Sequence, residues 1–229
     1  MTGLFPKWVN SMPTLLALAV IGGGVTTVGA VWYYFTPSYW EVGYMPKQPG
    51  SGFNHQKHAG KLGIDCRYCH TKIEKSPEAN VPNVATCYGC HAENRLSTEF
   101  VRDERVQFIR SAYAEDRTIQ WHRIHKLPDY VRNFPHHVHL KAGVSCYSCH
   151  GQIMGMPVVY QAKPLSMGWC LECHRDPGKR LVPPDKVTKL TWVEHELDAR
   201  AAGHSSVDVD ALLGSLRREP PQYCGACHH

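Results

Sequence analysis

The apolar residues of this chain are concentrated in one uninterrupted run near its start. Residues 15–35 read LLALAVIGGGVTTVGAVWYYF and carry no charge. At about 1.5 Å per residue, such a helix would be about 31 Å long, which is enough to cross the hydrocarbon core of a bilayer. Aromatic side chains flank the run on both sides, as they do at membrane–water interfaces: Phe5, Trp8, Trp32, Tyr33, Tyr34, Tyr39 and Trp40. The pattern predicts a transmembrane anchor over residues 13–36, preceded by a cytoplasmic N-terminus of residues 1–12.

A cleaved signal peptide is the alternative interpretation of this run, with Val28-Gly29-Ala30 as a cleavage site. The run is longer than the hydrophobic region of a signal peptide, which favours an uncleaved, single-pass anchor. Its many small residues would let another helix approach closely, and this favours a membrane subunit as partner. The small residues are Gly22, Gly23, Gly24, Thr26, Thr27, Gly29 and Ala30.

The rest of the chain shows little periodic apolar sequence, so we expect a fold that is mostly α and irregular. Residues 98–116 suit a helix with an apolar face formed by Val101, Arg105, Phe108, Ile109 and Ala112.

Two further helices are expected in the last fifty residues. Thr191–Glu194 resembles a capping box, which would open a helix that ends near Gly203. A shorter helix is expected from Ser206 to Arg217, where Pro220-Pro221 follows.

All ten cysteines fall in five copies of one motif, Cys-x-x-Cys-His. The first to fifth motifs are Cys66–His70, Cys87–His91, Cys146–His150, Cys170–His174 and Cys224–His228, with second cysteines Cys69, Cys90, Cys149, Cys173 and Cys227. In this motif the two thiols attach a c-type haem covalently, and the histidine binds its iron. A disulfide framework needs no histidine after every second cysteine, and zinc knuckles would be used in pairs. The sequence therefore predicts five covalent haems, with proximal ligands His70, His91, His150, His174 and His228.

The size of the chain limits how the haems can be housed. About 190 residues outside the anchor leave about 39 residues per haem, too few to wrap each in its own domain. We therefore expect the haems to form the core and to contact one another, as electron transfer requires. The formal charge of +5 counts only the protein. Each oxidised haem contributes about −1, so the holoprotein is near neutral, and no basic run suits nucleic acid.

A longer repeat surrounds the haem motifs. Phe53-x-His-x-x-His precedes the first motif, and Phe134-x-His-x-x-His precedes the third. Each element is followed by two motifs, which begin 21 residues apart in the first unit and 24 in the second. The predicted organisation of the outer-face domain, residues 37–229, is a dihaem unit over 50–95, a linker helix within 96–129, a dihaem unit over 130–178 and a fifth-haem segment over 179–229.

The ten histidines outside the motifs are the main candidates for distal ligands. Two imidazoles three residues apart on a helical turn project from the same side of the helix but point in diverging directions, so each can reach a different haem. This predicts distal ligands His55, His58, His136 and His139, while Phe53 and Phe134 could pack on porphyrin faces.

A fifth distal ligand is expected from the segment around Leu127-Pro128, where His125 is preferred over His122. His195 and a methionine (Met154, Met156 or Met167) remain alternatives. Bis-histidine ligation leaves no open coordination site, which favours electron transfer over chemistry at iron.

Several segments resemble the pentahaem cytochrome c subunit of alternative complex III, a quinol:electron-acceptor oxidoreductase: residues 42–49, 53–70, 81–87, 123–131 and 134–146. The Phe-x-His-x-x-His element also resembles class III multihaem cytochromes, in which its two histidines serve different haems. The resemblance covers about residues 40–176, and residues 181–222 show no pattern of the family. It implies a relay subunit that is no enzyme on its own. The implied partners are a polytopic quinol-oxidising subunit, an iron–sulfur subunit, a monohaem cytochrome, and a soluble periplasmic carrier or an oxidase.

Two other functions fit parts of the pattern. A self-sufficient multihaem quinol dehydrogenase of the short tetrahaem type would need a quinol-accessible haem beside the membrane, near Glu41 and Lys47. A multihaem reductase of nitrogen or sulfur oxyanions would need a five-coordinate haem, yet all five motifs end in histidine. Haem is attached to such motifs on the outer side of the plasma membrane, so the chain after Tyr39 is expected on the periplasmic or outer face.

Overall fold

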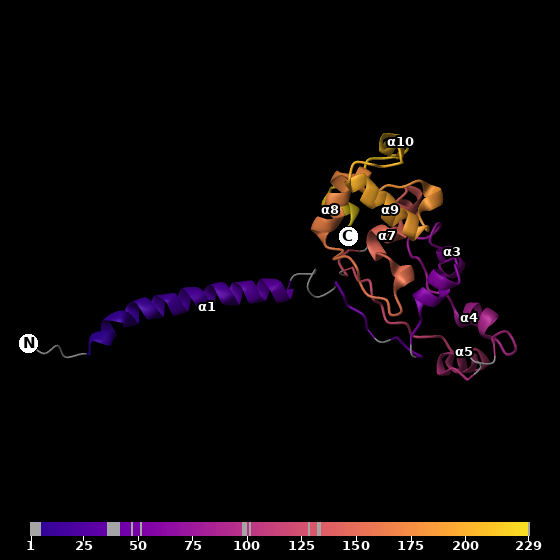
Figure 1. Cartoon of the computed structure of the whole chain (residues 1–229), viewed down its shortest axis with the longest axis horizontal. Coiled ribbons are helices and arrows are strands. Elements are labelled where there is room, and N and C mark those ends of the chain that lie inside the picture. The colour runs from indigo at the N-terminus through magenta and orange to yellow at the C-terminus, as the bar shows by residue number, and fades with distance from the viewer. Residues whose placement is uncertain are drawn as a thin grey trace, which may run out of the picture.

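In the part of the chain that the computed structural model describes, the regular secondary structure is helical. The described residues are 6–35, 42–46, 48–50, 52–97, 100, 102–127, 129–131 and 134–228. They contain no β-strand, only two isolated antiparallel bridges, Val131 with His228 and Val144 with Leu181. One long helix stands apart from a domain of short helices and loops (Figure 1). The predicted α and irregular fold is confirmed for these residues.

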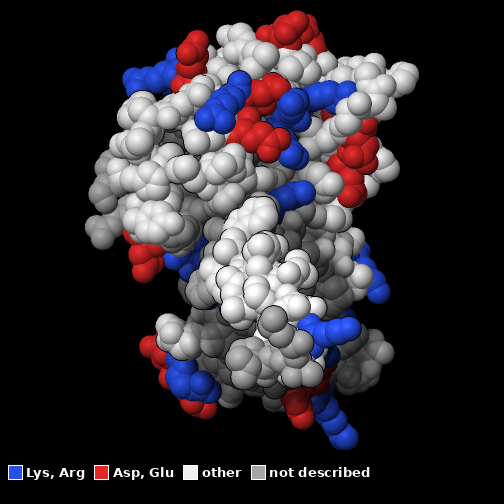
Figure 2. Space-filling model, turned by 90° about the vertical axis from the view of Figure 1, so that its left-hand side faces the viewer, with Lys and Arg blue, Asp and Glu red and all other residues white. Residues whose placement is uncertain are grey.

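The long helix is α1, Met12–Phe35, which follows a short 3-10 helix, Lys7–Ser11. Among the described residues, Lys7–Tyr34 is the one helical stretch long and apolar enough to cross a membrane, with a mean hydropathy of 1.9 and no buried part. A signal sequence near an N-terminus would have the same properties, so the membrane crossing stays a prediction. Figure 2 views the molecule from this side, where charges of both signs are interspersed on the domain around the uncharged helix.

Each haem motif begins a short helix or lies within one. The helices are α3 (Cys66–Cys69), α4 (Val84–His91), α7 (Cys146–His150), α8 (Met167–Arg175) and a 3-10 helix, Cys224–Ala226. Before the first four of them, the side chain of Asp65, Asn83, Ser145 or Ser166 accepts a hydrogen bond from a backbone amide of the first turn. Such N-caps set where a helix begins, so they also fix the cysteines that follow.

The two Phe-x-His-x-x-His elements are helical turns, as predicted. The first continues as a π-helix, Gln56–Lys61, and the second is α6, His136–Lys141. The remaining elements are α5 (Glu104–Ala114), α9 (Leu190–Ala201), α10 (Val209–Gly214) and 3-10 turns at Ile153–Gly155, Pro177–Lys179 and Pro184–Lys186.

The predicted helix over 98–116 is shorter than expected, and its buried face is different. Asp103 accepts a hydrogen bond from the amide of Arg105 at 2.9 Å, so the helix α5 begins only at Glu104. Its buried residues are Val106, Arg110 and Ala112. Arg105, placed on the apolar face by the sequence, instead forms an ion pair with Asp103. Residue 101 lies outside the described residues.

The predicted capping box at Thr191–Glu194 is wrong. The helix α9 begins at Leu190, after Lys189, without a side-chain cap. Glu194 instead accepts hydrogen bonds from the hydroxyl of Tyr147 at 3.1 Å and from the amide of Gln152 at 2.7 Å. The side chain therefore links α9 to the third haem motif. The last helix, α10, is capped by Asp208 and is shorter than the predicted 206–217.

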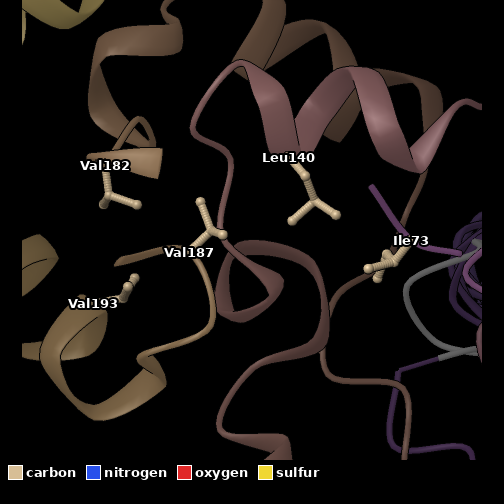
Figure 3. Close-up of a cluster of buried hydrophobic side chains, with 5 residues drawn as sticks. All are labelled: Ile73, Leu140, Val182, Val187 and Val193. Atoms are coloured by element: carbon tan, nitrogen blue, oxygen red, sulfur yellow. The ribbon is translucent and has the colours of Figure 1, made fainter. Parts of the chain in front are cut away.

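A small apolar cluster joins both halves of the domain (Figure 3). Ile73 follows the first motif and Leu140 lies in α6, while Val182, Val187 and Val193 come from the C-terminal segment. Segments far apart in the sequence thus share one core. The expectation that haems form the larger core stays a prediction.

A buried carboxylate holds the C-terminal segment together. Glu196 is 5% exposed and accepts hydrogen bonds from the hydroxyls of Ser205 and Ser206 and from Arg200. Arg200 in turn donates to the carbonyls of Gly178 and Leu181, at 2.7 and 2.8 Å. This pair connects the chain after the fourth motif with the chain that leads to the fifth.

Stability in acid should depend on this carboxylate. Burial alone would raise the pKa of Glu196, but the hydrogen bonds from Ser205, Ser206 and Arg200 outweigh it, and the pKa lies below its ordinary value of 4.5. The stabilisation is therefore present above about pH 4.5 and is lost as the pH falls through the folded pKa. Glu196→Gln should cost about 1–3 kcal/mol at pH 7 and lose less stability than the wild type on acidification. Thermal unfolding at pH 7 and pH 4 measures both, and equal acid losses would contradict the assignment.

Candidate haem sites

Cysteines of different haem motifs lie near one another in the structure. The thiols of Cys66 and Cys146 are hydrogen-bonded, which lowers the pKa of Cys66 to about 7 and raises that of Cys146. Burial and the neighbouring thiol of Cys69 raise the pKa of Cys87. The first motif is therefore adjacent to the third on one side and to the second on the other.

The remaining motifs continue in the same way. Burial and the nearby thiols of Cys173 and Cys170 raise the pKa of Cys149 to about 12. Burial and the thiol of Cys227 raise the pKa of Cys170. The motifs thus follow one another in space in the order second, first, third, fourth, fifth, which differs from their order in the sequence.

The two Phe-x-His-x-x-His turns have the same local geometry. The ring of Phe53 stacks on His58 with centroids 4.4 Å apart, and Phe134 stacks on His139 at 4.5 Å. Each phenylalanine meets the other histidine of its turn, His55 or His136, edge to face at 4.7 and 5.0 Å. The repeat in the sequence is therefore also a repeat in structure, with the phenylalanine holding the second histidine of each turn.

These second histidines each face the histidine of a haem motif. The ring centroids of His58 and His91 are 6.0 Å apart, and those of His139 and His174 are 6.2 Å apart. Two imidazoles that bind one metal ion from opposite sides, each at ~2 Å, have ring centres about 6 Å apart. The two pairs therefore have the spacing expected of axial ligands to the haems of the second and fourth motifs.

Backbone carbonyls select the tautomer of six histidines. In each of them, Nδ1 donates a hydrogen bond to a backbone carbonyl. The pairs of histidine and carbonyl are His70 with Asn80, His174 with Pro221, His228 with Tyr130, His58 with Asn54, His139 with Pro135 and His136 with Pro77. The distances are 2.6–2.9 Å, except 3.3 Å at His228. A proton fixed on Nδ1 leaves Nε2 free as a ligand, as at other metal-bound histidines. The sequence did not reveal these acceptors, because a carbonyl leaves no side-chain pattern.

A central group of five histidines lies between the two units: His55, His70, His125, His136 and His150. Burial, followed by the charges of neighbouring histidines, lowers the pKa of His55 and of His125 to about 4 and that of His150 well below its ordinary value. His55, His125 and His150 are therefore neutral, the form that binds a metal. Nδ1 of His55 and Nε2 of His125 are buried without a hydrogen-bond partner among the described residues. Buried neutral nitrogens of this kind fit haem ligation.

The group contains two motif histidines and three predicted distal ones. His125 meets His150 edge to face at 4.1 Å, closer than the ~6 Å of a pair that shares a metal ion. Among the described residues, no ring contact joins a distal candidate to the histidine of the fifth motif. The ring contact of His228 is with Tyr130, at 5.6 Å, and residue 229 is not described.

The alternative ligands have other surroundings. His195 is exposed on α9, Met167 is 68% exposed at the start of α8, and Met156 is buried. The sulfur of Met154 lies 3.9 Å from the hydroxyl of Thr191. The backbone N–H of His122 donates to the side-chain oxygen of Gln48 at 2.9 Å, and the side-chain nitrogen of Gln48 donates to the carbonyl of His122 at 3.1 Å. Glu41 and Lys47, named for a quinol site, lie outside the described residues.

One buried side chain anchors the segment that carries His125. Gln161 is fully buried, and its side chain accepts a hydrogen bond from the amide of Lys126 at 3.2 Å. Its backbone pairs with Gly43 and Tyr44 at 2.7 and 3.0 Å. The chain that follows α1 is thus bound to the chain that carries a predicted ligand. Sequence reasoning missed this residue, since a lone glutamine carries no signal.

Comparison with known proteins finds one informative relative, while no family model matches. Over 110 residues the chain is 28% identical to the menaquinone reductase multihaem cytochrome c subunit of Nitratidesulfovibrio vulgaris. This chain is similar to a multihaem cytochrome c. The match covers 48% of the chain and spans about half the length of the relative, 49%. It supports covalent haem c, as the motifs predict, without testing the number five or the ligands.

Proposed function

We propose that the chain is a membrane-anchored pentahaem c-type cytochrome that relays electrons from quinol oxidation to a periplasmic carrier or an oxidase. In this role it is an electron-transfer subunit of a quinol:electron-acceptor oxidoreductase of the alternative complex III type. The relative supports the quinol-linked part of the proposal, because it is named as a subunit of a menaquinone reductase. The resemblance of residues 40–176 supports the more specific assignment.

The single observation that carries the proposal is the continuous row of motifs in space. Each pair of neighbours is close enough for one thiol to affect the pKa of the other. Haems bound through these thiols would lie beside one another from the second motif to the fifth. When bound, the iron of each haem accepts and releases one electron, which no side chain of the chain can do.

The protein's own contribution is to present imidazoles to the irons, six of them in a tautomer fixed by a backbone carbonyl. We assign His58 with His91 and His139 with His174, because their ring spacings of 6.0 and 6.2 Å suit a shared iron. His70 and His150 take their distal ligands from His55, His125 and His136. At these four haems, axial histidines on both faces would leave no position for a small substrate, which favours a relay over a reductase.

The proposed location is the plasma membrane, with α1 as a single span and the haem domain on the periplasmic or outer face. A polytopic quinol-oxidising subunit, an iron–sulfur subunit and a monohaem cytochrome are the proposed partners. The uncharged surface of α1 supports contact with lipid or with such a membrane subunit, since none of it is covered by the domain.

Extraction of the native complex tests this function. Membranes are solubilised gently, separated on a native gel and stained for haem, and the haem-positive band is analysed by mass spectrometry. We expect a large band that contains a polytopic membrane protein and an iron–sulfur protein, with five haem adducts on this chain. A small band with this chain alone, able to oxidise quinol, would instead identify a self-sufficient quinol dehydrogenase.

A further inference from the structure

A buried arginine reaches the back of the second haem motif from the neighbouring helix. Arg110 lies in α5 and is 9% exposed. Its Nε donates to the carbonyl of His91 at 2.9 Å, and its Nη2 donates to the carbonyl of Ala92 at 3.1 Å. A second guanidinium, from the exposed Arg95, donates to the carbonyl of Gly89 within the same motif. Two cations thus face the backbone that carries the motif histidine.

The charge of Arg110 is only partly neutralised. The nearest carboxylate, Glu93, lies 3.7 Å from Nε and is 58% exposed, so water screens it. It also accepts a hydrogen bond from the hydroxyl of Tyr88 at 2.7 Å. Asp103, at the start of the same helix, is paired with Arg105. A buried, incompletely paired cation acts over a longer range than a surface one, because little solvent screens it.

We propose that Arg110 is a positioning residue for the haem of the second motif, which fixes His91 from behind and raises the reduction potential of that haem. The proposal rests on the proposed function and deepens it. An oxidised haem carries one positive charge more than a reduced one, so a nearby cation disfavours the oxidised state. The two hydrogen bonds also hold the last residue of α4, which is His91.

The position of the second motif in the row determines what a raised reduction potential does to electron flow. The second motif is one end of the row of motifs, and α4 and α5 lie together at one edge of the domain (Figure 1). A raised potential at a terminal haem makes that end the one where electrons collect. We therefore place the electron exit of the relay at the second motif.

Helix packing should survive the loss of the charge. The rings of Tyr88 and Tyr113 stack at 3.8 Å with an angle of 6° between their planes, which joins α4 to α5 independently of Arg110. Val106 is also buried on α5. A variant that removes only the cation therefore leaves other contacts to hold His91 near its place.

Redox titration of the full-length, detergent-solubilised cytochrome tests the proposal, after mass spectrometry has confirmed covalent haem. His58→Met first marks the component of the second motif, because a methionine ligand raises a haem potential. Arg110→Gln should shift that component alone to lower potential, with all haems still low-spin. Arg110→Lys keeps the charge and should shift it by less than half as much. Arg117→Gln, at an exposed arginine just after α5 that is paired with Glu115, is the matched control and should shift nothing.

A change of opposite sign makes the test independent of how well Arg110→Gln folds. Glu93→Gln removes the carboxylate beside Arg110 and should shift the same component to higher potential. Unchanged potentials in Arg110→Gln and Glu93→Gln, or equal shifts in Arg110→Gln and Arg110→Lys, would overturn the proposal. These outcomes concern one haem in the isolated chain, so they are distinct from a failure of the native-complex experiment.

Discussion

Replacing His58 or His139 by alanine is expected to convert one haem from low-spin to high-spin, while every covalent haem stays attached. Both rings lie about 6 Å from a motif histidine, and both are held by a stacked phenylalanine. Alanine removes the distal imidazole and leaves the thioether bonds untouched. The second and fourth motifs are separated by two others, so we expect additive effects in the double variant. Electron paramagnetic resonance and visible spectra measure the change.

The exposed His204 provides the matched control, because it lies after α9 and its amide bonds only within that turn. His204→Ala should leave all spectra unchanged. If His58→Ala and His139→Ala retained the full low-spin signal, both ligand assignments would be wrong. A loss of haem from the gel band instead of a spin change would show that these histidines act in attachment or folding.

The haem chemistry that the sequence predicts depends on short covalent motifs, and the multihaem relative supports its coarse form. The five Cys-x-x-Cys-His copies and the two Phe-x-His-x-x-His turns are local patterns, and their spacing is readable without a fold. The geometry of the turns then follows from this spacing, since two histidines three residues apart on one helical turn must diverge. The long apolar helix is predicted to within a residue or two for the same reason.

What the sequence could not predict is the set of contacts between distant segments. The order of the motifs in space depends on pairs such as Cys66 with Cys146, eighty residues apart. Glu194 fits a capping box on local pattern, yet Tyr147 in the third haem motif and Gln152 just after it hold its side chain instead. Arg110 looks like a solvated helix residue, but two free carbonyls at the end of α4 make its burial favourable. Tertiary contacts override local preference in each case.

Gly143→Ala is expected to destabilise the domain by about 3 kcal/mol or more, since it combines backbone strain with a steric conflict. Gly143 has φ +90°, which disfavours any side chain, and an added Cβ would lie 2.3 Å from the carbonyl oxygen of Val182. That oxygen belongs to backbone that is fully buried and cannot rotate away. The amide of Val182 also donates to the carbonyl of Gly143 at 2.9 Å, so the two segments cannot separate without losing this bond.

Gly203→Ala is the matched control that separates strain from contact. Gly203 has φ +78°, but no heavy atom lies within 4 Å of its added Cβ, so the cost should be about 1 kcal/mol. Denaturant unfolding of both holoproteins, followed by far-ultraviolet circular dichroism, gives the two free energies. The loss of unfolding free energy in Gly143→Ala beyond that in Gly203→Ala measures how closely segment 181–182 packs against the turn that ends α6. That turn immediately follows His139, so the same variant should also weaken the low-spin signal of the fourth haem. Equal costs at the two glycines would mean that this approach is loose and that His139 is positioned within its own turn, by Phe134 and the carbonyl of Pro135.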